Sequence, residues 1–144
     1  MIEKYEEIID DYKKFIESHS QYNPRVVKYN TNTSTYFPVV CCYLSNFIDT
    51  DYCTIDKIEN HQEMYLTTEV YTKDKTKDNE TIASQVINDE LVKLTMEFFN
   101  RLNLKMTLCR ITPNLDTSIL RRTMQHQGLV GLARKNIIRR WNYA

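Results

Sequence analysis

Residues 64–140 decide the fold, and their sequence is MYLTTEVYTKDKTKDNETIASQVINDELVKLTMEFFNRLNLKMTLCRITPNLDTSILRRTMQHQGLVGLARKNIIRR. Apolar and polar side chains alternate over Met64–Thr72, which predicts a strand with one apolar face. Apolar residues at helical spacing then predict a helix over about Glu80–Asn103, long enough to cover a sheet. Two more strands are predicted after it, at Lys105–Thr112 and Thr117–Gln127.

Short polar segments separate these elements. The charged loop KDKTKDN at 73–79 offers Asp78 or Asn79 as the N-cap of the helix. Asn103 can end that helix, because asparagine tolerates a left-handed backbone. The sequence TPNLD at 112–116 predicts a turn, so the two strands around it are expected to pair antiparallel.

The N-terminal part of the chain adds a helix and a strand. The helix is predicted from about Ile2 to Ser18, where isoleucine and aromatic residues recur at helical spacing. Tyr36–Leu44 predicts a strand buried on both faces, because its apolar run is nearly continuous. Arg25–Tyr29 can form a short extended piece, and Ser45–Asn60, which has no strong period, is interpreted as a loop or a short helix.

These elements predict a single α+β domain over residues 1–144 with two layers. A mainly antiparallel sheet of about four strands is expected to pack against two helices on one face. A parallel pairing of strands 64–72 and 105–112 stays open, because the intervening helix is long enough for a crossover. The basic C-terminal segment, about 129–144, is not assigned, although Asn136–Trp141 can form a last short strand.

The composition is that of an ordinary globular domain. Of the 144 residues, 42% are hydrophobic and 26% charged, and two glycines and three prolines leave no room for a flexible linker. The N-terminal sequence carries acids throughout, unlike a signal peptide. The apolar run FPVVCCYL is far shorter than the roughly 20 residues that a membrane helix needs. We therefore expect a cytoplasmic origin, reduced cysteines and no membrane partner.

The neutral net charge hides a polarity along the chain. Residues 1–100 hold 10 basic and 18 acidic side chains, whereas residues 101–144 hold 9 basic side chains and one acidic. In a head-to-tail ring, such oppositely charged ends can meet between neighbouring subunits and fix their register. The alternative is that the two segments neutralise each other within one subunit.

No recognisable catalytic motif is present in the sequence. A phosphate-binding loop needs well-placed glycines, and Gly128 and Gly131 do not have that arrangement. His19, His61 and His126 lie in no nucleophile motif. We expect His126, which lies between two glutamines, to be solvated or at an interface.

Metal binding has weak support in the sequence. No CxxC spacing exists, and Asp49 with Asp51, or a cysteine with His61, lacks the spacing of a known site. The sequence therefore predicts no enzyme, no cofactor and no metal. A small enzyme with an undetected site stays open as an alternative, and its sign would be a deep pocket holding His126 or Asp49 with a strongly perturbed pKa.

Basic and aromatic residues near the C-terminal end are the best candidates for a surface that binds a partner. Such side chains suit protein interfaces, where they combine buried area with polar reach, and also nucleic acid. The neutral total charge favours a protein partner, and a solvated edge with a frayed tail is the alternative. The candidates for a subunit or tube interface are Arg121, Arg122, Arg134, Lys135, Arg139, Arg140, Trp141 and Tyr143.

Three segments carry a resemblance to a known group of proteins: TEVYT at 68–72, ITPNLD at 111–116 and ILRRTM at 119–124. Their order resembles that in bacteriophage tail terminator or tail completion (neck) proteins of long-tailed phages. In that pattern a strand leads through a Lys-rich loop into a helix, and a strand, a PNLD-type turn and an Arg-bearing strand follow. The resemblance covers roughly residues 37–140, and the closing sequence LVGLARKNIIRRWNYA has no firm place in it.

The resemblance implies a structural virion protein, not an enzyme, that forms a ring, typically a homohexamer. Such a ring caps the tail tube and joins it to the neck, so the expected partners are further copies, the tail tube protein, neck or connector proteins and, in a contractile tail, the sheath protein. The expected location is the tail or neck of the virion, assembled in the bacterial cytoplasm. A head–tail connector is the first alternative, and a small nucleic-acid-binding accessory protein is the second.

Strand 117–127 and the tail to Tyr143 are expected to help form subunit or tube contacts, because arginine and aromatic residues concentrate there. On this interpretation, reversing Arg121 and Arg122 to Glu weakens assembly and leaves the monomer folded.

Overall fold

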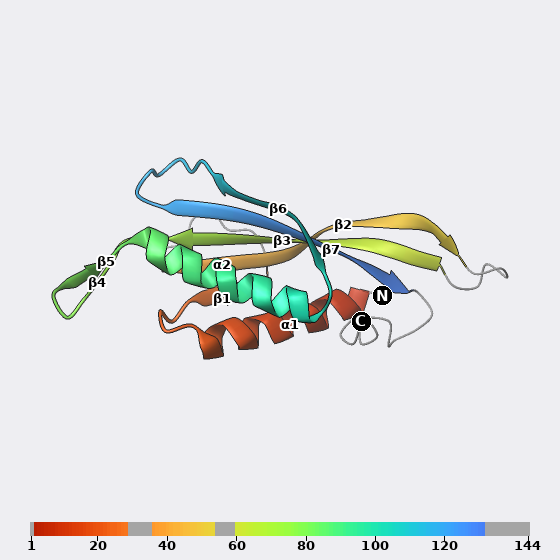
Figure 1. Cartoon of the computed structure of the whole chain (residues 1–144), viewed down its shortest axis with the longest axis horizontal. Coiled ribbons are helices and arrows are strands. Elements are labelled where there is room, and N and C mark those ends of the chain that lie inside the picture. Colours follow the sequence, from red (N-terminus) through yellow and green to blue (C-terminus); the bar gives the residue numbers. More distant parts are fainter. Residues whose placement is uncertain (1, 29–35, 54–59, 132–144) are drawn as a thin grey trace.

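The computed structural model describes residues 2–28, 36–53 and 60–131 of the chain (Figure 1). The helices are α1 (Ile2–His19) and α2 (Ser84–Arg101). The strands are β1 (Arg25–Val27), β2 (Val39–Cys53), β3 (Asn60–Thr72), β4 (Lys75–Lys77), β5 (Glu80–Ile82), β6 (Lys105–Thr112) and β7 (Leu120–Gly131).

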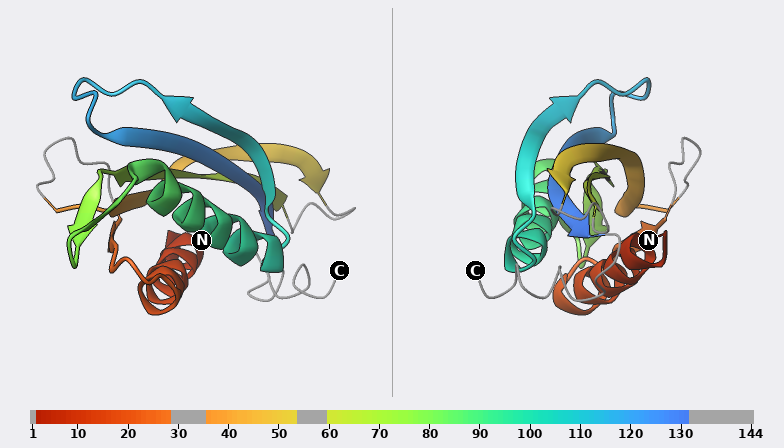
Figure 2. Two further views of the ribbon diagram at one scale, coloured as in Figure 1. Left: turned by 60° about the vertical axis from the view of Figure 1, so that its left-hand side comes forward. Right: turned by 90° about the vertical axis from the view of Figure 1, so that its right-hand side faces the viewer.

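Five strands form the main sheet, in the order β1-β2-β3-β7-β6. Its neighbouring strands are antiparallel, apart from β1 and β2, which are parallel. In the described part of the chain, both helices cover the same face of the sheet (Figure 2). This is the predicted α+β architecture with helices on one side, with one strand more than expected and a separate hairpin of β4 and β5.

Strand β3 shows the alternation that its sequence predicts. Met64, Leu66 and Val70 are fully buried in the core between the sheet and the helices. Tyr71 and Glu69 belong to the opposite face, where the Tyr71 ring packs in a second, smaller cluster. The period-two pattern therefore identifies the core-facing side of β3 correctly.

The first part of strand β2, Val39–Cys42, is buried on both of its faces, as its continuous apolar run predicts. Cys42 lies in the core under the helices, and its neighbour Cys41 lies in the smaller cluster on the other face. Both thiols are fully buried, and burial raises the pKa of Cys42 to about 12. These two cysteines therefore serve as small apolar side chains, as expected.

Tyr12 joins the two helices at the centre of the core. Its ring is fully buried and stacks on Phe99 of α2, with the ring centroids 5.2 Å apart. The hydroxyl lies 2.7 Å from Thr95 Oγ1, and Thr95 Oγ1 donates to the Leu91 carbonyl oxygen at 2.7 Å. Because Thr95 uses its proton on Leu91, the Tyr12 hydroxyl is the donor to Thr95.

Substituting Tyr12 by phenylalanine is expected to lower the free energy of unfolding by about 1 kcal/mol, the net value of one buried hydrogen bond. The ring stays in place, and Thr95 keeps its bond to Leu91. Urea unfolding of both proteins measures the difference. Thr95→Val should cost more, because it leaves the buried Tyr12 hydroxyl without its partner; equal costs for the two variants would contradict this arrangement.

The interpretation of residues 45–60 as a loop or short helix is wrong where the structure describes them. Strand β2 continues to Cys53, and β3 already begins at Asn60. The ladder accommodates an irregularity between Leu44 and Asn46, where the Ser45 hydroxyl donates to the Tyr65 carbonyl oxygen at 2.9 Å. Pairing with β3 thus imposes strand structure on a segment whose own sequence has no period.

The predicted start of the second helix is also wrong. Residues 80–82 form β5, which pairs with β4 in a short hairpin that projects beyond the sheet (Figure 1). The two N-cap candidates, Asp78 and Asn79, occupy the hairpin turn with positive φ angles of 53° and 64°, as a type I′ turn requires. Helix α2 begins at Ser84, and its N-cap is Ala83.

The end of α2 follows the prediction. Asn103 has a φ of 56°, and its N–H bonds to the Asn100 carbonyl oxygen at 3.0 Å. The N–H of Leu104 bonds back to the Phe99 carbonyl oxygen, also at 3.0 Å. This pair of bonds is a Schellman motif, which directs the chain from α2 into β6.

Strands β3 and β6 do not pair with each other, because β7 lies between them. The parallel pairing that the sequence left open is therefore excluded. The last strand begins at Leu120, three residues later than expected, and continues to Gly131. The possible strand at 136–141 lies outside the described residues.

None of the helices in the described ranges is both long and apolar enough to cross a membrane.

Candidate subunit interface

Strand β6 forms one edge of the main sheet. It pairs with β7 on one side, and no described strand pairs with its other side. With eight residues it is much longer than β1, the three-residue strand at the opposite edge. A long edge strand leaves a row of backbone N–H and carbonyl groups that another chain can pair with.

Apolar side chains line β6 on the side of the sheet that carries the helices. Met106, Cys109 and Ile111 lie opposite His126, Met124 and Arg122 of β7 in the ladder, and directly opposite residues share a face. Helix α2 does not cover these three side chains: Ile111 is 60% exposed, Met106 is 41% exposed and Cys109 is an exposed free thiol. We call Met106, Cys109 and Ile111 the β6 stripe.

The loop between β6 and β7 extends this apolar surface. Leu115 is entirely exposed at its tip. Asp116 holds the loop in shape, because its Oδ1 accepts hydrogen bonds from the Ser118 backbone N–H at 3.0 Å and from the Ser118 hydroxyl at 2.6 Å. These two bonds lower the pKa of Asp116, so the carboxylate is charged at neutral pH. Figure 2 shows the loop projecting away from the helices.

Arg121, one of the predicted interface residues, forms an ion pair within its own subunit. Its guanidinium donates from Nε to Glu69 Oε1 at 3.0 Å and makes a second bond from Nη2 to the same oxygen. The Glu69 side chain is only 3% exposed, and it also accepts hydrogen bonds from the hydroxyls of Tyr71 and Thr123. Arg121 therefore compensates a buried carboxylate and is part of the fold itself.

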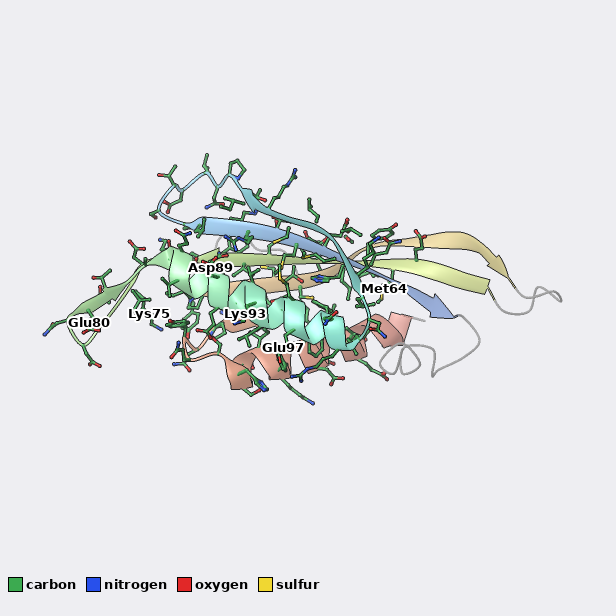
Figure 3. All side chains as sticks on the ribbon, viewed as in Figure 1. Met64, Lys75, Glu80, Asp89, Lys93 and Glu97 are labelled. Atoms are coloured by element: carbon green, nitrogen blue, oxygen red, sulfur yellow. The ribbon has the colours of Figure 1, made fainter. Side chains whose placement is uncertain are left out.

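Arg122 also pairs within the subunit, on the opposite face of β7. Its Nη1 atom donates to Asp89 Oδ1 of α2 at 3.0 Å. Figure 3 shows Asp89 in the first half of α2, below β7 in the view. This ion pair links α2 to β7, and the Asp89 side chain is about half exposed.

These two ion pairs bear on the charge polarity of the chain. Each joins a base of the C-terminal part to an acid of the first hundred residues, so part of the polarity is neutralised inside one subunit, the second of the two alternatives. The other predicted interface residues, Arg134, Lys135, Arg139, Arg140, Trp141 and Tyr143, lie outside the described residues.

The sequence predicts that His126 is solvated or at an interface; the structure excludes the first of these within the subunit, because His126 is 2% exposed. Its ring packs against Phe99 with the centroids 4.5 Å apart, and it lines a hollow of about 450 Å³ between α2 and β6. Burial lowers the pKa of His126 from 6.5 to about 4, so the imidazole is neutral at neutral pH. The flanking glutamines do not indicate whether His126 is exposed, because neighbouring residues of a strand point to opposite faces of the sheet.

The other candidates for chemistry are not brought together. In the described ranges, no three histidine, cysteine or acidic side chains form a group that could hold a metal ion. His19 stacks on Phe15 at the end of α1, far along the chain from His126. The side chains of Asp49, Asp51 and His61 lie outside the described ones.

Comparison with known proteins leaves the question of function to the structure. The sequence matches no protein-family model and no curated protein sequence.

The sequence analysis did not identify the free edge of the sheet. The strand expected to form subunit contacts, 117–127, corresponds to β7, which is paired on both sides, whereas β6 is open on one side. Two features of the sequence could have drawn attention to this edge. A leucine stands inside the otherwise polar turn TPNLD. The segment KMTLCRIT also lacks the regular alternation of a half-buried strand, and in the structure its ladder is irregular between Met106 and Leu108.

Proposed function

We propose that this protein is a structural virion protein, a ring-forming tail terminator that caps a phage tail tube and joins it to the neck. The observation that carries the proposal from the structure is the open, apolar edge formed by the β6 stripe and Leu115. An edge of this kind is a liability in a monomer and is usually protected. Contact with a second subunit or with the tube would cover it.

The mechanism of such a ring is geometric. One surface of the ring makes the contacts with the tube that a further tube ring would make, while another surface does not bind further tube subunits. Repetition of one asymmetric contact around an axis generates a closed ring, typically of six copies in the group that the sequence resembles. The proposed partners are therefore further copies of the chain, the tube protein and the neck proteins, with the sheath protein added in a contractile tail.

A head–tail connector or neck protein is the alternative within the same class. It would use the same edge for ring formation and would bind a different neighbour. Capping of tube ends separates the two proposals, because a terminator stops tube growth and a connector does not.

The small-enzyme alternative has one observation in its favour, the hollow that contains His126. Two features weigh against catalysis there. Burial is the cause of the low pKa, and a base with a pKa of about 4 accepts protons poorly at neutral pH. The only described ring contact of His126 is with Phe99, and no described nucleophile is hydrogen-bonded to it. The hollow is better suited to binding.

The nucleic-acid alternative is weakened by the ion pairs of β7. Arg121 and Arg122 each bond to a carboxylate of the same subunit, so neither is a free cation for a phosphate. A steep loss of DNA binding with rising salt would be needed to restore this alternative.

The test is negative-stain electron microscopy of the purified protein, alone at high concentration and mixed with tail tubes of the phage that encodes it. Rings, or caps on tube ends, are the expected result. Ile111→Lys should lower the fraction of capped ends about tenfold, because a lysine on an edge strand blocks pairing and stacking, and tenfold corresponds to about 1.4 kcal/mol.

Val86→Lys is the matched control, since Val86 on α2 is similarly exposed at 53% but does not belong to the β6 stripe. The control should cap tubes as well as the wild type does. A protein that forms no rings and ignores the tubes would remove the terminator proposal.

A further inference from the structure

The hollow beside His126 lies in the corner where α2 turns into β6. Its volume of about 450 Å³ is within the range of sites that bind a small molecule or a side chain. Figure 3 shows Glu97, one of its lining residues, near the end of α2 that leads into β6. The lining residues are Met96, Glu97, Asn100, Leu104, Lys105, Met106 and His126.

One polar atom of a lining residue has no hydrogen-bond partner. His126 is 2% exposed, and its Nδ1 atom is buried without a hydrogen bond. A buried nitrogen without a hydrogen bond destabilises the protein, and most such atoms in proteins are paired. The two methionines and the leucine among the lining residues indicate a site for a group that is mostly apolar.

The loop between β6 and β7 presents such a group. Leu115 is the most exposed large apolar side chain in the described residues. The bonds between Ser118 and Asp116 hold the loop in one shape, which lowers the entropy that binding would lose.

Leu115 cannot reach the hollow of its own chain. The hollow is at the start of β6, beside Lys105 and Met106, and the loop follows the end of the strand. Eight residues of strand span roughly 26 Å. The occupant must therefore come from another molecule.

We propose that Leu115 of one copy inserts into the His126 hollow of a second copy, so that the chains associate head to tail. The charges next to the two surfaces agree with this contact. Asp116 follows Leu115 and is paired only loosely, 3.8 Å from Lys73 Nζ. Lys105 at the rim of the hollow is exposed and forms no ion pair with a described residue, so it can meet the incoming Asp116.

This inference rests on the proposed function and deepens it, because it names the contact from which a ring can be built. Loop and hollow are different surfaces of the same chain, so each copy can hold one neighbour and be held by another. Such a heterologous contact forms a closed ring when the rotation from one subunit to the next is a whole fraction of a full turn. An isologous contact, by contrast, produces only a dimer.

The test uses two variants of the full chain. Leu115→Asp removes the inserting side chain, and Asn100→Trp fills the hollow from an exposed position on α2. Sedimentation velocity of each variant alone should show at least a tenfold loss of association relative to the wild type. Mixing the two should restore association only as far as a heterodimer, because each pair has one intact loop and one intact hollow. Val86→Asp, elsewhere on the exposed surface, is the control that should associate normally.

A cross-link tests the same contact where association is weak. Leu115→Cys and Asn100→Cys are combined in a Cys109→Ser background, since Cys109 is an exposed free thiol. Oxidised glutathione should then produce intermolecular disulfides that peptide mapping assigns to positions 100 and 115. A variant that carries only one of the two introduced cysteines, in the same Cys109→Ser background, is the control and should give no such bond.

Each outcome decides the inference. Rings or caps that persist in Leu115→Asp, a mixture that does not complement, or the absence of the 100–115 cross-link would overturn it and leave the terminator proposal standing. If the mixture complements and the cross-link forms but the wild type ignores tail tubes, the contact is real and the terminator proposal fails.

Discussion

Replacing Arg121 by glutamate is expected to lower the free energy of unfolding by about 3–5 kcal/mol, the usual cost of removing one partner from a buried ion pair. Glu69 is almost fully buried and receives two of its hydrogen bonds from Arg121. The variant would leave that carboxylate without its cation and place a second carboxylate beside it. Urea unfolding at neutral pH measures the change.

Arg122→Glu is the matched control on the neighbouring residue. Its partner Asp89 is 55% exposed, so water already screens the pair. Pairs of this kind contribute about 0–1 kcal/mol, and a loss of that size is expected. Equal losses for Arg121→Glu and Arg122→Glu would contradict the structural role that the buried Glu69 gives to Arg121.

This difference changes how assembly should be tested. The sequence suggests that reversing Arg121 and Arg122 together would weaken assembly in a folded monomer. The Glu69 contact predicts that the double variant loses stability first, so a missing ring would not distinguish a lost interface from a lost fold. Ile111 and Leu115 are better positions, because both side chains are largely exposed.

Acidification is expected to destabilise the protein through His126. The pKa of this buried histidine is about 4, against 6.5 for an ordinary histidine. Between about pH 4 and pH 6.5, the imidazole is therefore protonated in the unfolded chain but not in the folded protein. The stability that the neutral ring provides is fully present above pH 6.5 and is lost as the pH falls through about 4.

The size of this effect follows from the shift. At 1.36 kcal/mol per pKa unit, the contribution of His126 amounts to about 3 kcal/mol between pH 7 and pH 4. Urea unfolding at the two pH values measures the total change, and NMR titration of the imidazole resonance measures its pKa directly. Carboxylates also titrate in this interval, so a variant without the histidine is needed to isolate its share.

His126→Leu supplies that comparison. Its stability should fall less between pH 7 and pH 4 than that of the wild type, by about 3 kcal/mol. A wild-type imidazole that titrates near its ordinary pKa, or a variant with the same pH dependence as the wild type, would show that the ring is not buried in the way the structure has it.

Much of the fold follows from local patterns. The apolar period of β3, the stripe along α1 and the left-handed asparagine at the end of α2 each depend on residues close in sequence. For that reason the two helices, the antiparallel strands and the placing of helices on one face are predicted correctly. The β4–β5 hairpin was missed because Asp78 and Asn79 suit both a helix N-cap and a type I′ turn.

The candidate site depends on partners far away in sequence. Whether a strand is central or at an edge is decided by pairing, which makes β7 a central strand and β6 an edge strand. Arg121 acquires Glu69, 52 residues away, as its partner. No local pattern records such contacts.

The sequence by itself therefore determined the class of fold, the positions of most elements and the face of β3 that enters the core, because hydrophobic periodicity acts over a few residues. Only the tertiary structure decided that Arg121 and Arg122 form ion pairs within the subunit and that His126 is buried beside a hollow. It also decided that β6 is an edge strand whose apolar side chains, together with Leu115, are exposed. Strand order and burial arise when distant segments pack together, and the free energy of those contacts overrides local preference.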